Sequence, residues 1–379
     1  MRICYLADAT STHTQRWVGF FASQGHEVHL VSALPSSHVG AGVIYHQLPA
    51  TNNELLLTRR LPRIRGFENL WRTRRQIRAL IGSIQPDLVH AHFISTYGKL
   101  AYLAGRKPYI VTAWGTDIYG FHNLRCVDRI LTRQCLRRAD LVTCDSQDLK
   151  RAIVALGVQG ARVQVVHHGV DTELFRPLVH RHELRATLGI ADHEWVLLSP
   201  RSLKPLYNIE IIVKAFFRVC AAVPDSRLVI KDYYGDPAYR ESVFALVRGL
   251  GLERRVTFAG YGPYEDMARW YNVADIVVSL ATTDSAPMSV LEAMACGAIV
   301  VASDLASLRD YVANGEDGFL VDPRDEKVVA EKIIEALLKW HGVDASRSTR
   351  NRRVVIQKAD YGTHMRRMQC LCANLLGAN

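Results

Sequence analysis

The sequence predicts an α/β protein made of two Rossmann-like, doubly wound domains, and three observations support this fold class. Short apolar runs alternate with helical stretches through both halves of the chain, which is typical of parallel sheets covered by helices. The chain has 379 residues, more than one hydrophobic core usually serves. Apolar residues make up 49% of it, as in a globular protein. The cleft between two such domains is the expected ligand site.

The expected elements follow each other regularly along the chain. In the first half we expect strands at residues 2–6, 27–31, 88–92, 109–113, 141–144 and 163–167, with helices between them, for example at 16–24 and 69–84. In the second half we expect strands at residues 196–199, 228–231, 256–258, 276–279, 299–302 and 319–321. Helical stretches at 326–339 and 354–376 end the chain.

The domain boundaries follow from this order of elements. We expect a first domain over residues 1–177, a second over 186–350 and a C-terminal helical segment over 351–379. The polar residues from Pro177 to about Arg185 are interpreted as the linker between the domains.

The net charge of +10 is unevenly distributed. Residues 1–180 contain 22 Lys or Arg and 12 Asp or Glu, whereas residues 181–379 contain 25 of each kind. Such asymmetry favours an anionic partner for the first half, either a phosphorylated acceptor or an anionic membrane surface; solubility alone is the simpler explanation. No nucleic-acid-binding motif accompanies the charge, so we expect no nucleic-acid partner.

The chain shows no sign of export, membrane insertion or a structural metal. Its first strand begins at Arg2 and leaves no room for a signal peptide. No apolar run approaches the roughly 20 residues that span a bilayer. The eight cysteines are scattered without zinc-ribbon or redox spacing. We therefore expect a cytoplasmic protein, at most peripherally attached to the inner face of the membrane.

The stretch from Asp275 to Asp304 carries the most chemistry. It predicts a buried strand, a polar loop, a helix over Met288–Ala295 ended by Gly297, and a second buried strand. Ligands of open α/β sheets bind where strands end, and backbone N–H groups at a helix start attract anions. Glu292, one turn inside the helix, would then accept hydroxyl hydrogen bonds from a ribose. The alternative is an ordinary βαβ unit with a solvated Glu292.

This stretch resembles the signature of the retaining glycosyltransferases of family four, which have the GT-B fold. The family pattern is an acid, seven residues, Glu, and then Ala-Met-Ala-x-Gly; here it runs from Asp284 to Glu292 and on through AMACG. The resemblance implies that Glu292 holds the donor ribose and that Asp284 contacts the donor sugar. The first acid is often Glu in the family, so Asp284 is a shorter variant.

The resemblance extends to the first strand of the second domain and its loop. Arg201, at the strand end, matches a family cation that holds phosphate oxygens. The family Lys five positions later is Leu206 here, so either Lys204 replaces it or Tyr207 and Asn208 contact the phosphate instead.

Further donor contacts are implied at two loops. Gly260 and Tyr261 match a loop that borders the nucleobase, and Pro287, Met288 and Ser289 start the phosphate-binding helix.

The acceptor side is expected in the first domain. Ser11, Thr12 and His13 stand where relatives often have glycines, and His13 is either a ligand contact or a polar loop residue. Trp114 replaces a histidine that many relatives place near the reaction centre, and it either stacks on a sugar or simply packs. Asp117 matches the family pattern.

Residues 59–78 combine arginines with apolar residues at helical spacing. The segment contains Arg59, Arg60, Arg63, Arg65, Phe67, Leu70, Trp71, Arg72, Arg74, Arg75 and Arg78. The pattern indicates either a membrane-surface helix or an ordinary surface helix whose apolar face packs on its own sheet.

Together, residues and resemblance predict a retaining transfer of sugar from a UDP- or GDP-linked nucleotide sugar to a hydroxyl group. The acceptor would be a glycan, a lipid-linked saccharide or a small molecule, in cell-surface polysaccharide or glycolipid assembly, and neither a metal nor another cofactor is expected. The predicted catalytic residues are Arg201, Asp284, Glu292 and Asp117. Two alternatives are a nucleotide-sugar-binding protein without transferase activity and a nucleotide-sugar epimerase of the same fold.

Overall fold

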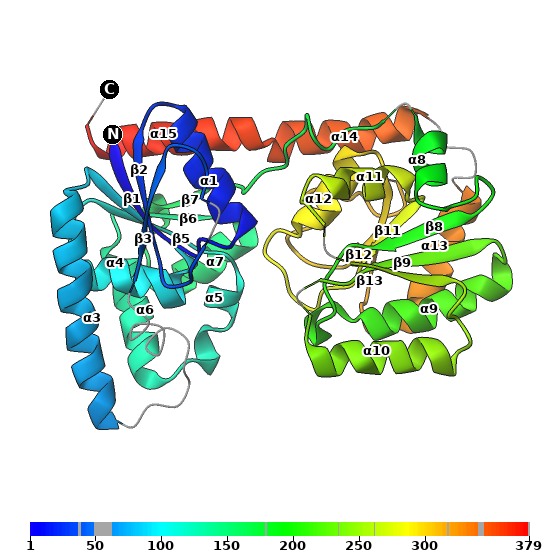
Figure 1. The fold of residues 1–379 in the computed structure, drawn as a ribbon, viewed down its shortest axis with the longest axis horizontal. Coiled ribbons are helices and arrows are strands. Elements are labelled where there is room, and N and C mark those ends of the chain that lie inside the picture. Colours follow the sequence, from blue (N-terminus) through cyan, green and yellow to red (C-terminus); the bar gives the residue numbers. More distant parts are fainter. Residues whose placement is uncertain are drawn as a thin grey trace. The chain divides into compact units, whose positions relative to one another are not determined.

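The computed structural model describes residues 1–36, 39–48, 63–178, 180–233, 235–260, 262–316, 318–339 and 345–377, and the side chains of all of these except 63–70 and 345–348. The chain divides into two compact units. Unit 1 is Met1–His168 with Thr363–Asn379, and unit 2 is Gly169–Gly362. Each contains one parallel sheet with helices on both faces, which confirms the predicted fold class (Figure 1).

The sheet of unit 1 has the strand order β3-β2-β1-β4-β5-β6-β7. Its strands are β1 (Arg2–Leu6), β2 (Glu27–Ser32), β3 (Val43–Gln47), β4 (Leu88–His92), β5 (Tyr109–Thr112), β6 (Leu141–Cys144) and β7 (Val163–Val165). All pairs are parallel, so the strand ends at Leu6, His92 and Thr112 lie at one edge. The sequence analysis did not predict β3, whose residues are only partly buried.

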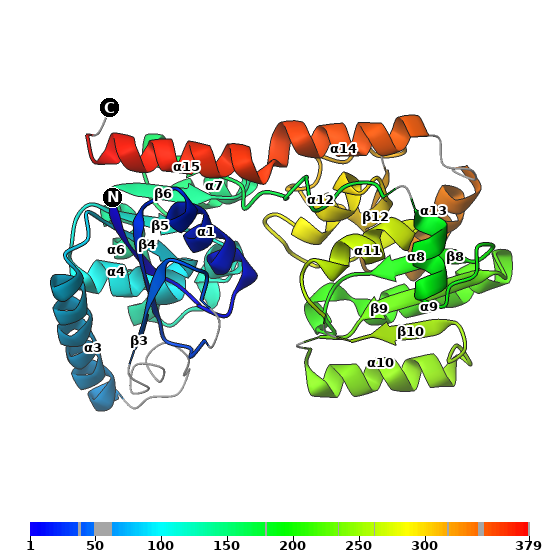
Figure 2. The ribbon, with the colours of Figure 1, turned by 45° about the horizontal axis from the view of Figure 1, so that its top comes forward.

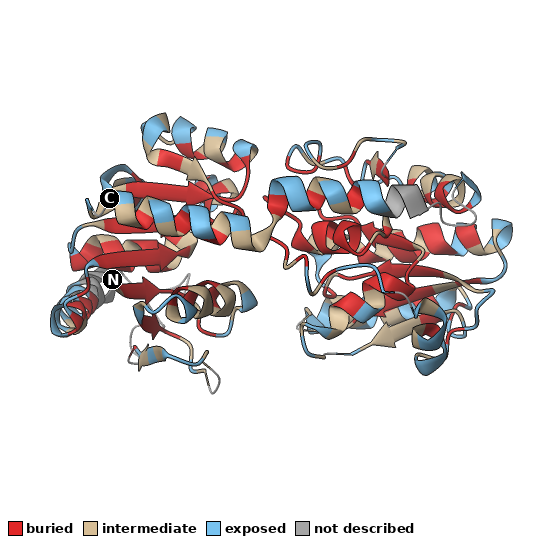
Figure 3. Cartoon of the chain, turned by 90° about the horizontal axis from the view of Figure 1, so that it is seen from above, coloured by how far each residue is buried: buried red, intermediate tan, exposed pale blue. Residues whose placement is uncertain are grey.

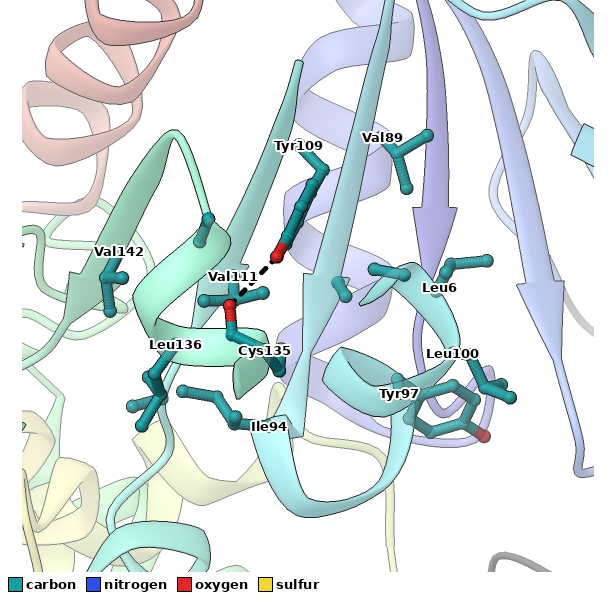
Figure 4. Close-up of a cluster of buried hydrophobic side chains, with 14 of the residues drawn as sticks. Leu6, Val89, Ile94, Tyr97, Leu100, Tyr109, Val111, Cys135, Leu136 and Val142 are labelled. Atoms are coloured by element: carbon teal, nitrogen blue, oxygen red, sulfur yellow. Dashed lines mark hydrogen bonds between the residues drawn. The ribbon is translucent and has the colours of Figure 1, made fainter. Parts of the chain in front are cut away.

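The helices of unit 1 connect these strands. They are α1 (Thr12–Ser23), α3 (Arg63–Ile84), α4 (Lys99–Ala104), α5 (Thr116–Tyr119), α6 (Cys126–Arg138), α7 (Gln147–Ala155) and α15 (Tyr361–Leu375), with short turns at Phe93–Gly98, Phe121–Asn123 and Gly160–Arg162. The main core lies between the sheet and the layer of α3, α4, α6 and α7. Figure 4 shows part of it, where the Tyr109 hydroxyl donates to the carbonyl of Cys135 at 2.9 Å.

The sheet of unit 2 has the order β10-β9-β8-β11-β12-β13, again all parallel. Its strands are β8 (Trp195–Ser199), β9 (Ser226–Lys231), β10 (Val256–Ala259), β11 (Ile276–Ser279), β12 (Ile299–Ser303) and β13 (Gly318–Val321). Every one was predicted within a few residues, because each is a run of buried apolar residues with polar boundaries.

Two helix layers cover this sheet, and each encloses a core of its own. One layer contains α9 (Ile209–Ala222), α10 (Pro237–Gly249) and α13 (Glu326–Lys339), and a short turn at Pro205–Tyr207 precedes α9. The other contains α8 (Arg181–Thr187), α11 (Asp266–Val273), α12 (Met288–Ala295) and α14 (Ala345–Ala359). Figure 3 shows most strands of each unit buried beneath helices with exposed outer faces, whereas β3 and β10 are partly exposed.

Two segments differ from the sequence prediction. The expected linker near residues 177–185 runs into α8, where Arg185 is 4% exposed and pairs with Asp275, so the segment packs onto unit 2. The expected helix 354–376 is instead two helices, α14 and α15, both labelled in Figure 2. They are interrupted at Asp360, where the backbone forms a bridge with Val170. No helix among the described residues is long and apolar enough to cross a membrane.

Candidate functional site

The predicted phosphate-binding helix exists with the predicted bounds, Met288–Ala295, directly after β11 and a polar loop. Its apolar residues are buried all round, so the sheet and the surrounding helices fix its position. The loop before it is held by Ser307, whose hydroxyl donates to the Asp284 carbonyl at 3.0 Å. Pro287 and Met288 are buried at the helix start, and Ser289 is partly exposed.

Glu292 lies on this helix and is only 5% exposed. The Tyr271 hydroxyl donates to its Oε2 at 3.0 Å, and the Tyr264 hydroxyl donates to its Oε1 at 2.5 Å. Burial, together with the charge of Glu292, raises the pKa of Tyr271 well above its usual value, so Tyr271 remains a donor. Each carboxylate oxygen can accept about two hydrogen bonds.

Arg201 follows β8 at the carboxyl edge of the same sheet. One guanidinium nitrogen lies 2.8 Å from Oδ2 of Asp284, and the other donates to the Ser289 hydroxyl at 3.2 Å. The guanidinium also stacks 4.1 Å from the ring centre of Tyr207. Burial alone would lower the pKa of Arg201, but Asp284 and Tyr207 outweigh it and raise the pKa. The structure thus brings three predicted residues, Arg201, Asp284 and Ser289, into direct contact.

Several residues near this site were not predicted. Lys231 ends β9, donates to the Gly260 carbonyl at 2.8 Å and lies 5.3 Å from the ring centre of Trp270. Its position at a strand end was a usable signal, the same one that identified Arg201. Tyr264 and Tyr271 do not belong to a recognisable sequence motif, because their hydrogen bonds to Glu292 depend on how α11 packs against α12.

The other predicted donor residues have different surroundings. Lys204 is exposed, and no described contact links its side chain to the Arg201–Asp284 pair. Gly260 is exposed and receives the Lys231 hydrogen bond. Tyr261 lies outside the described residues.

The predicted acceptor residues of unit 1 form an aromatic cluster at the carboxyl edge of its sheet. Ser11 precedes α1, Thr12 is exposed, and His13 lies in the first turn. The His13 ring stacks on His168 with centroids 4.6 Å apart, and Trp114 meets His13 edge-on at 5.7 Å. His168, which follows β7, was not predicted as part of this group.

The imidazoles of His92 and His168 are uncharged at neutral pH. Burial, with the neighbouring His13 charge, lowers the pKa of His92 to about 3 and that of His168 well below its usual value. The partly exposed members of the cluster are His13 and Trp114, whose rings suit sugar faces and hydroxyls.

Asp117 lies beneath this cluster and is 3% exposed. Its Oδ1 accepts the N–H of Trp114 at 3.0 Å, and its Oδ2 accepts the N–H of Ile94 at 2.7 Å. Burial raises the pKa of Asp117 to about 6, although the backbone donors oppose the shift. The carboxylate therefore holds two loops together and fixes Trp114. Among the described residues, no group of three or more His, Cys, Asp or Glu could hold a metal ion.

Comparison with known proteins gives one family match in each half of the chain. The model described as "Glycosyl transferases group 1" matches residues 180–354. The model described as "Glycosyl transferase 4-like" matches residues 2–146.

Two relatives are similar over most of the chain. N-acetyl-alpha-D-glucosaminyl L-malate synthase of Bacillus anthracis is 24% identical over 83% of this chain and 81% of its own length. The putative glycosyltransferase EpsD of Bacillus subtilis is 29% identical over 68% of this chain and 69% of its own length.

Solved structures share the fold. Sucrose-phosphate synthase of Thermosynechococcus elongatus superimposes with a TM-score of 0.83 at 20% identity over the whole of both chains. Anabaena HepE in complex with UDP-glucose has a TM-score of 0.77 at 19% identity, again over the whole of both chains. The lipopolysaccharide outer core galactosyltransferase WaaB has a TM-score of 0.67 at 15% identity over 97% of this chain and 98% of its own. These likenesses confirm the predicted GT-B fold.

Proposed function

Because the chain belongs to the group 1 glycosyltransferases, the retaining family four, and transfers a sugar from a nucleotide-sugar donor, we propose that it glycosylates a hydroxyl group in the assembly of a cell-surface polysaccharide or glycolipid. The donor that we propose is UDP-linked, supported by the UDP-glucose complex of HepE. The observation that carries the donor site is the contact of Arg201 with Asp284 and Ser289 at the start of the helix that contains Glu292.

Each residue of this group has a distinct proposed role. Glu292 accepts the ribose hydroxyls, and Tyr264 and Tyr271 hold its carboxylate in place. Arg201 and the backbone N–H groups of Met288 and Ser289 stabilise the diphosphate as the leaving group gains charge.

Asp284 orients the donor sugar. In the structure it neutralises Arg201, so diphosphate binding exchanges one anionic partner of the guanidinium for another. Lys204, Gly260 and Tyr261 would add contacts at the edge of the donor.

The transfer itself requires no protein nucleophile. The acceptor oxygen forms a bond to the anomeric carbon on the same face from which the phosphate leaves. The bond between the anomeric carbon and the phosphate oxygen breaks. The departing phosphate oxygen takes the proton of the acceptor hydroxyl. The configuration at the anomeric carbon is therefore retained. His13 and Trp114 form the acceptor side, and Asp117 acts by positioning Trp114.

Two observations support the proposed acceptor class. The excess positive charge in the first half favours an anionic or membrane-associated acceptor. WaaB, which shares the fold, is a lipopolysaccharide outer core galactosyltransferase. The similarity to N-acetyl-alpha-D-glucosaminyl L-malate synthase makes a small-molecule acceptor the main alternative.

Glu292→Ala tests the donor site. Hydrogen bonds to a charged group contribute about 1.5–3 kcal/mol, so we expect the Kd for UDP to rise about tenfold or more in calorimetric titration. Glu253→Ala, which removes an exposed carboxylate of the same unit, is the control and should leave the Kd unchanged. Unchanged UDP affinity and turnover in Glu292→Ala would refute the assignment. Product analysis with donor alone separates transfer from epimerisation.

A further inference from the structure

One face of unit 1 carries a concentration of positive charge. Helix α3 contains six arginines and one glutamate, and α6 contains four arginines and one aspartate. That aspartate, Asp128, is paired with Lys99 at 2.7 Å. Most of the net charge of +10 therefore resides on two helices.

These two helices belong to one layer and share its outer surface. The inner sides of α3 and α6 bury Ile77, Ile81 and Leu136 in the same core, and α4 lies between the two helices in contact with both. Among the described side chains, the exposed arginines are Arg72, Arg74, Arg75 and Arg78 on α3 and Arg129, Arg133, Arg137 and Arg138 on α6. We call this outer surface of α3 and α6 the basic face.

Large apolar side chains are exposed among these arginines. Trp71 on α3 is 65% exposed, and Val127 and Ile130 on α6 are 63% and 55% exposed. Val127 and Ile130 are three residues apart and so neighbour each other on the helix surface. Arginines alone would suit any polyanion, whereas exposed Trp, Val and Ile gain free energy only where water is excluded.

The three apolar residues lie toward one end of the layer. Helices that connect parallel strands run antiparallel to them, so their N-terminal halves lie toward the carboxyl edge of the sheet. Trp71 lies in the first half of α3, and Val127 and Ile130 lie in the first half of α6. His13 and Trp114 lie at the same edge.

We propose that the basic face docks on an anionic lipid membrane, with its arginines at the lipid headgroups and with Trp71, Val127 and Ile130 inserted at the headgroup–acyl boundary. Charge complementarity selects the anionic surface, and the apolar residues select a bilayer over a nucleic acid. This orientation turns the acceptor edge of unit 1 toward the lipid. Docking does not depend on the proposed transferase reaction, because it requires no donor.

The test is co-sedimentation of the full chain with phosphatidylcholine vesicles that contain or lack phosphatidylglycerol, without donor. We expect binding only with phosphatidylglycerol, weakening as salt is added. Each arginine near an anionic surface contributes about fivefold to partitioning, so Arg72→Gln/Arg75→Gln/Arg129→Gln should weaken binding about a hundredfold. The control, Arg248→Gln/Arg254→Gln/Arg324→Gln, removes three exposed arginines of unit 2 and should bind as the unaltered chain does.

A second variant separates the insertion of apolar side chains into the bilayer from the electrostatic attraction of arginines to the headgroups. Trp71→Ala/Ile130→Ala keeps every charge and should still weaken vesicle binding at least tenfold, because it removes the inserted area. Equal binding to both vesicle types, or equal losses in the two triple variants, would overturn the proposal. So would a duplex oligonucleotide bound as tightly as the vesicles, or a dimer in light scattering that the double variant dissociates. The circular dichroism spectrum and the urea denaturation midpoint of each variant report whether the unit that carries the substitutions is folded.

Discussion

At the residue scale, the proposed donor site depends on how Glu292 is held. A buried carboxylate is costly unless hydrogen bonds satisfy it, and the two tyrosines supply these bonds. The two tyrosines also fix the rotamer of the Glu292 side chain. The conformational entropy of that side chain is therefore lost when the protein folds, and ligand binding does not have to reduce it again.

Tyr271→Phe tests this positioning role. The substitution removes the donor to Oε2 and keeps the ring, which packs near Phe175 at 5.9 Å between centroids. We expect the Kd for UDP to rise about tenfold, with a smaller loss of stability, because a hydrogen bond to a charged group contributes about 1.5–3 kcal/mol. Calorimetric titration measures the Kd. Val277→Ala in the same core is the comparison: a purely structural effect would lower stability in both variants and leave the UDP affinity of both unchanged.

Asp284→Asn separates binding from turnover. If the diphosphate replaces Asp284 as the partner of Arg201, removing that charge should tighten UDP binding about threefold to tenfold, since it removes about 1 kcal/mol of competition and repulsion. The rate of transfer should fall at the same time, because the donor sugar loses its carboxylate. Titration with UDP and a transfer assay measure the two effects. Weaker UDP binding would instead mean that Asp284 serves to orient Arg201.

The sequence identified the residues of this site that belong to a family motif, but it missed Lys231, although Lys231 ends a strand. Arg201, Asp284 and Glu292 were predicted in this way, and the structure brings Arg201 and Asp284 into contact. Tyr264 and Tyr271 were missed because a tyrosine in or before a helix has no sequence pattern that distinguishes a packed ring from a hydrogen-bond donor. Asp117 matched the family pattern, but only the structure shows its bonds to two backbone N–H groups.

At the element scale, the junction between α14 and α15 depends on a close backbone contact. The Val170 N–H donates to the Ala359 carbonyl at 2.7 Å, and the Tyr361 N–H donates to the Val170 carbonyl at 2.9 Å. This pairing interrupts the helix at Asp360, and Gly362, the helix-disfavouring residue nearest in the sequence, lies within α15 and not at the break. The sequence therefore predicted one helix, since the cause lies in a segment about 190 residues away.

Gly169→Ala tests the junction. Gly169 has φ +74°, and a Cβ there would lie 2.4 Å from Cα of Tyr361. We expect a loss of about 2–4 kcal/mol in the free energy of unfolding, from the left-handed conformation and from overpacking together. Gly189→Ala is the matched control: its φ is +67° and no atom lies within 4 Å of the added Cβ, so only the backbone cost of about 1–2 kcal/mol applies. Equal losses in urea denaturation would contradict the close-contact argument.

At the scale of the whole molecule, the two halves have similar architecture and different electrostatics. Both sheets are parallel and were predictable from alternating apolar runs. The arginine excess and the buried histidines both belong to unit 1. Periodicity revealed the helix surfaces that carry charge, but it could not show which histidines are buried, because these follow short strands whose neighbours come from distant parts of the chain.

The stability of unit 1 should consequently fall as the solution is acidified. Burial lowers the pKa of four histidines, His90, His92, His167 and His168, below the ordinary value of 6.5. The unfolded chain then binds more protons than the folded chain below that pH. Stability contributed by these groups is complete above about pH 6.5 and is lost as pH falls toward about 3. Asp117 acts in the opposite direction between its ordinary value and about 6, but it is a single group.

His92→Leu measures how much His92 contributes to the loss of stability at low pH. Between pH 7.5 and 5, each neutral buried histidine should reduce the free energy of unfolding by about 2 kcal/mol, so the variant should lose about that much less than the unaltered chain over the same range. The groups that face His92 are the imidazoles of His13 and His90 and the rings of Trp17, Trp114 and Tyr5. His193→Leu, at an exposed histidine of unit 2, should keep the original pH dependence. Urea denaturation at several pH values gives the slopes, and parallel slopes for His92→Leu and the unaltered chain would mean that His92 is protonated in the folded state.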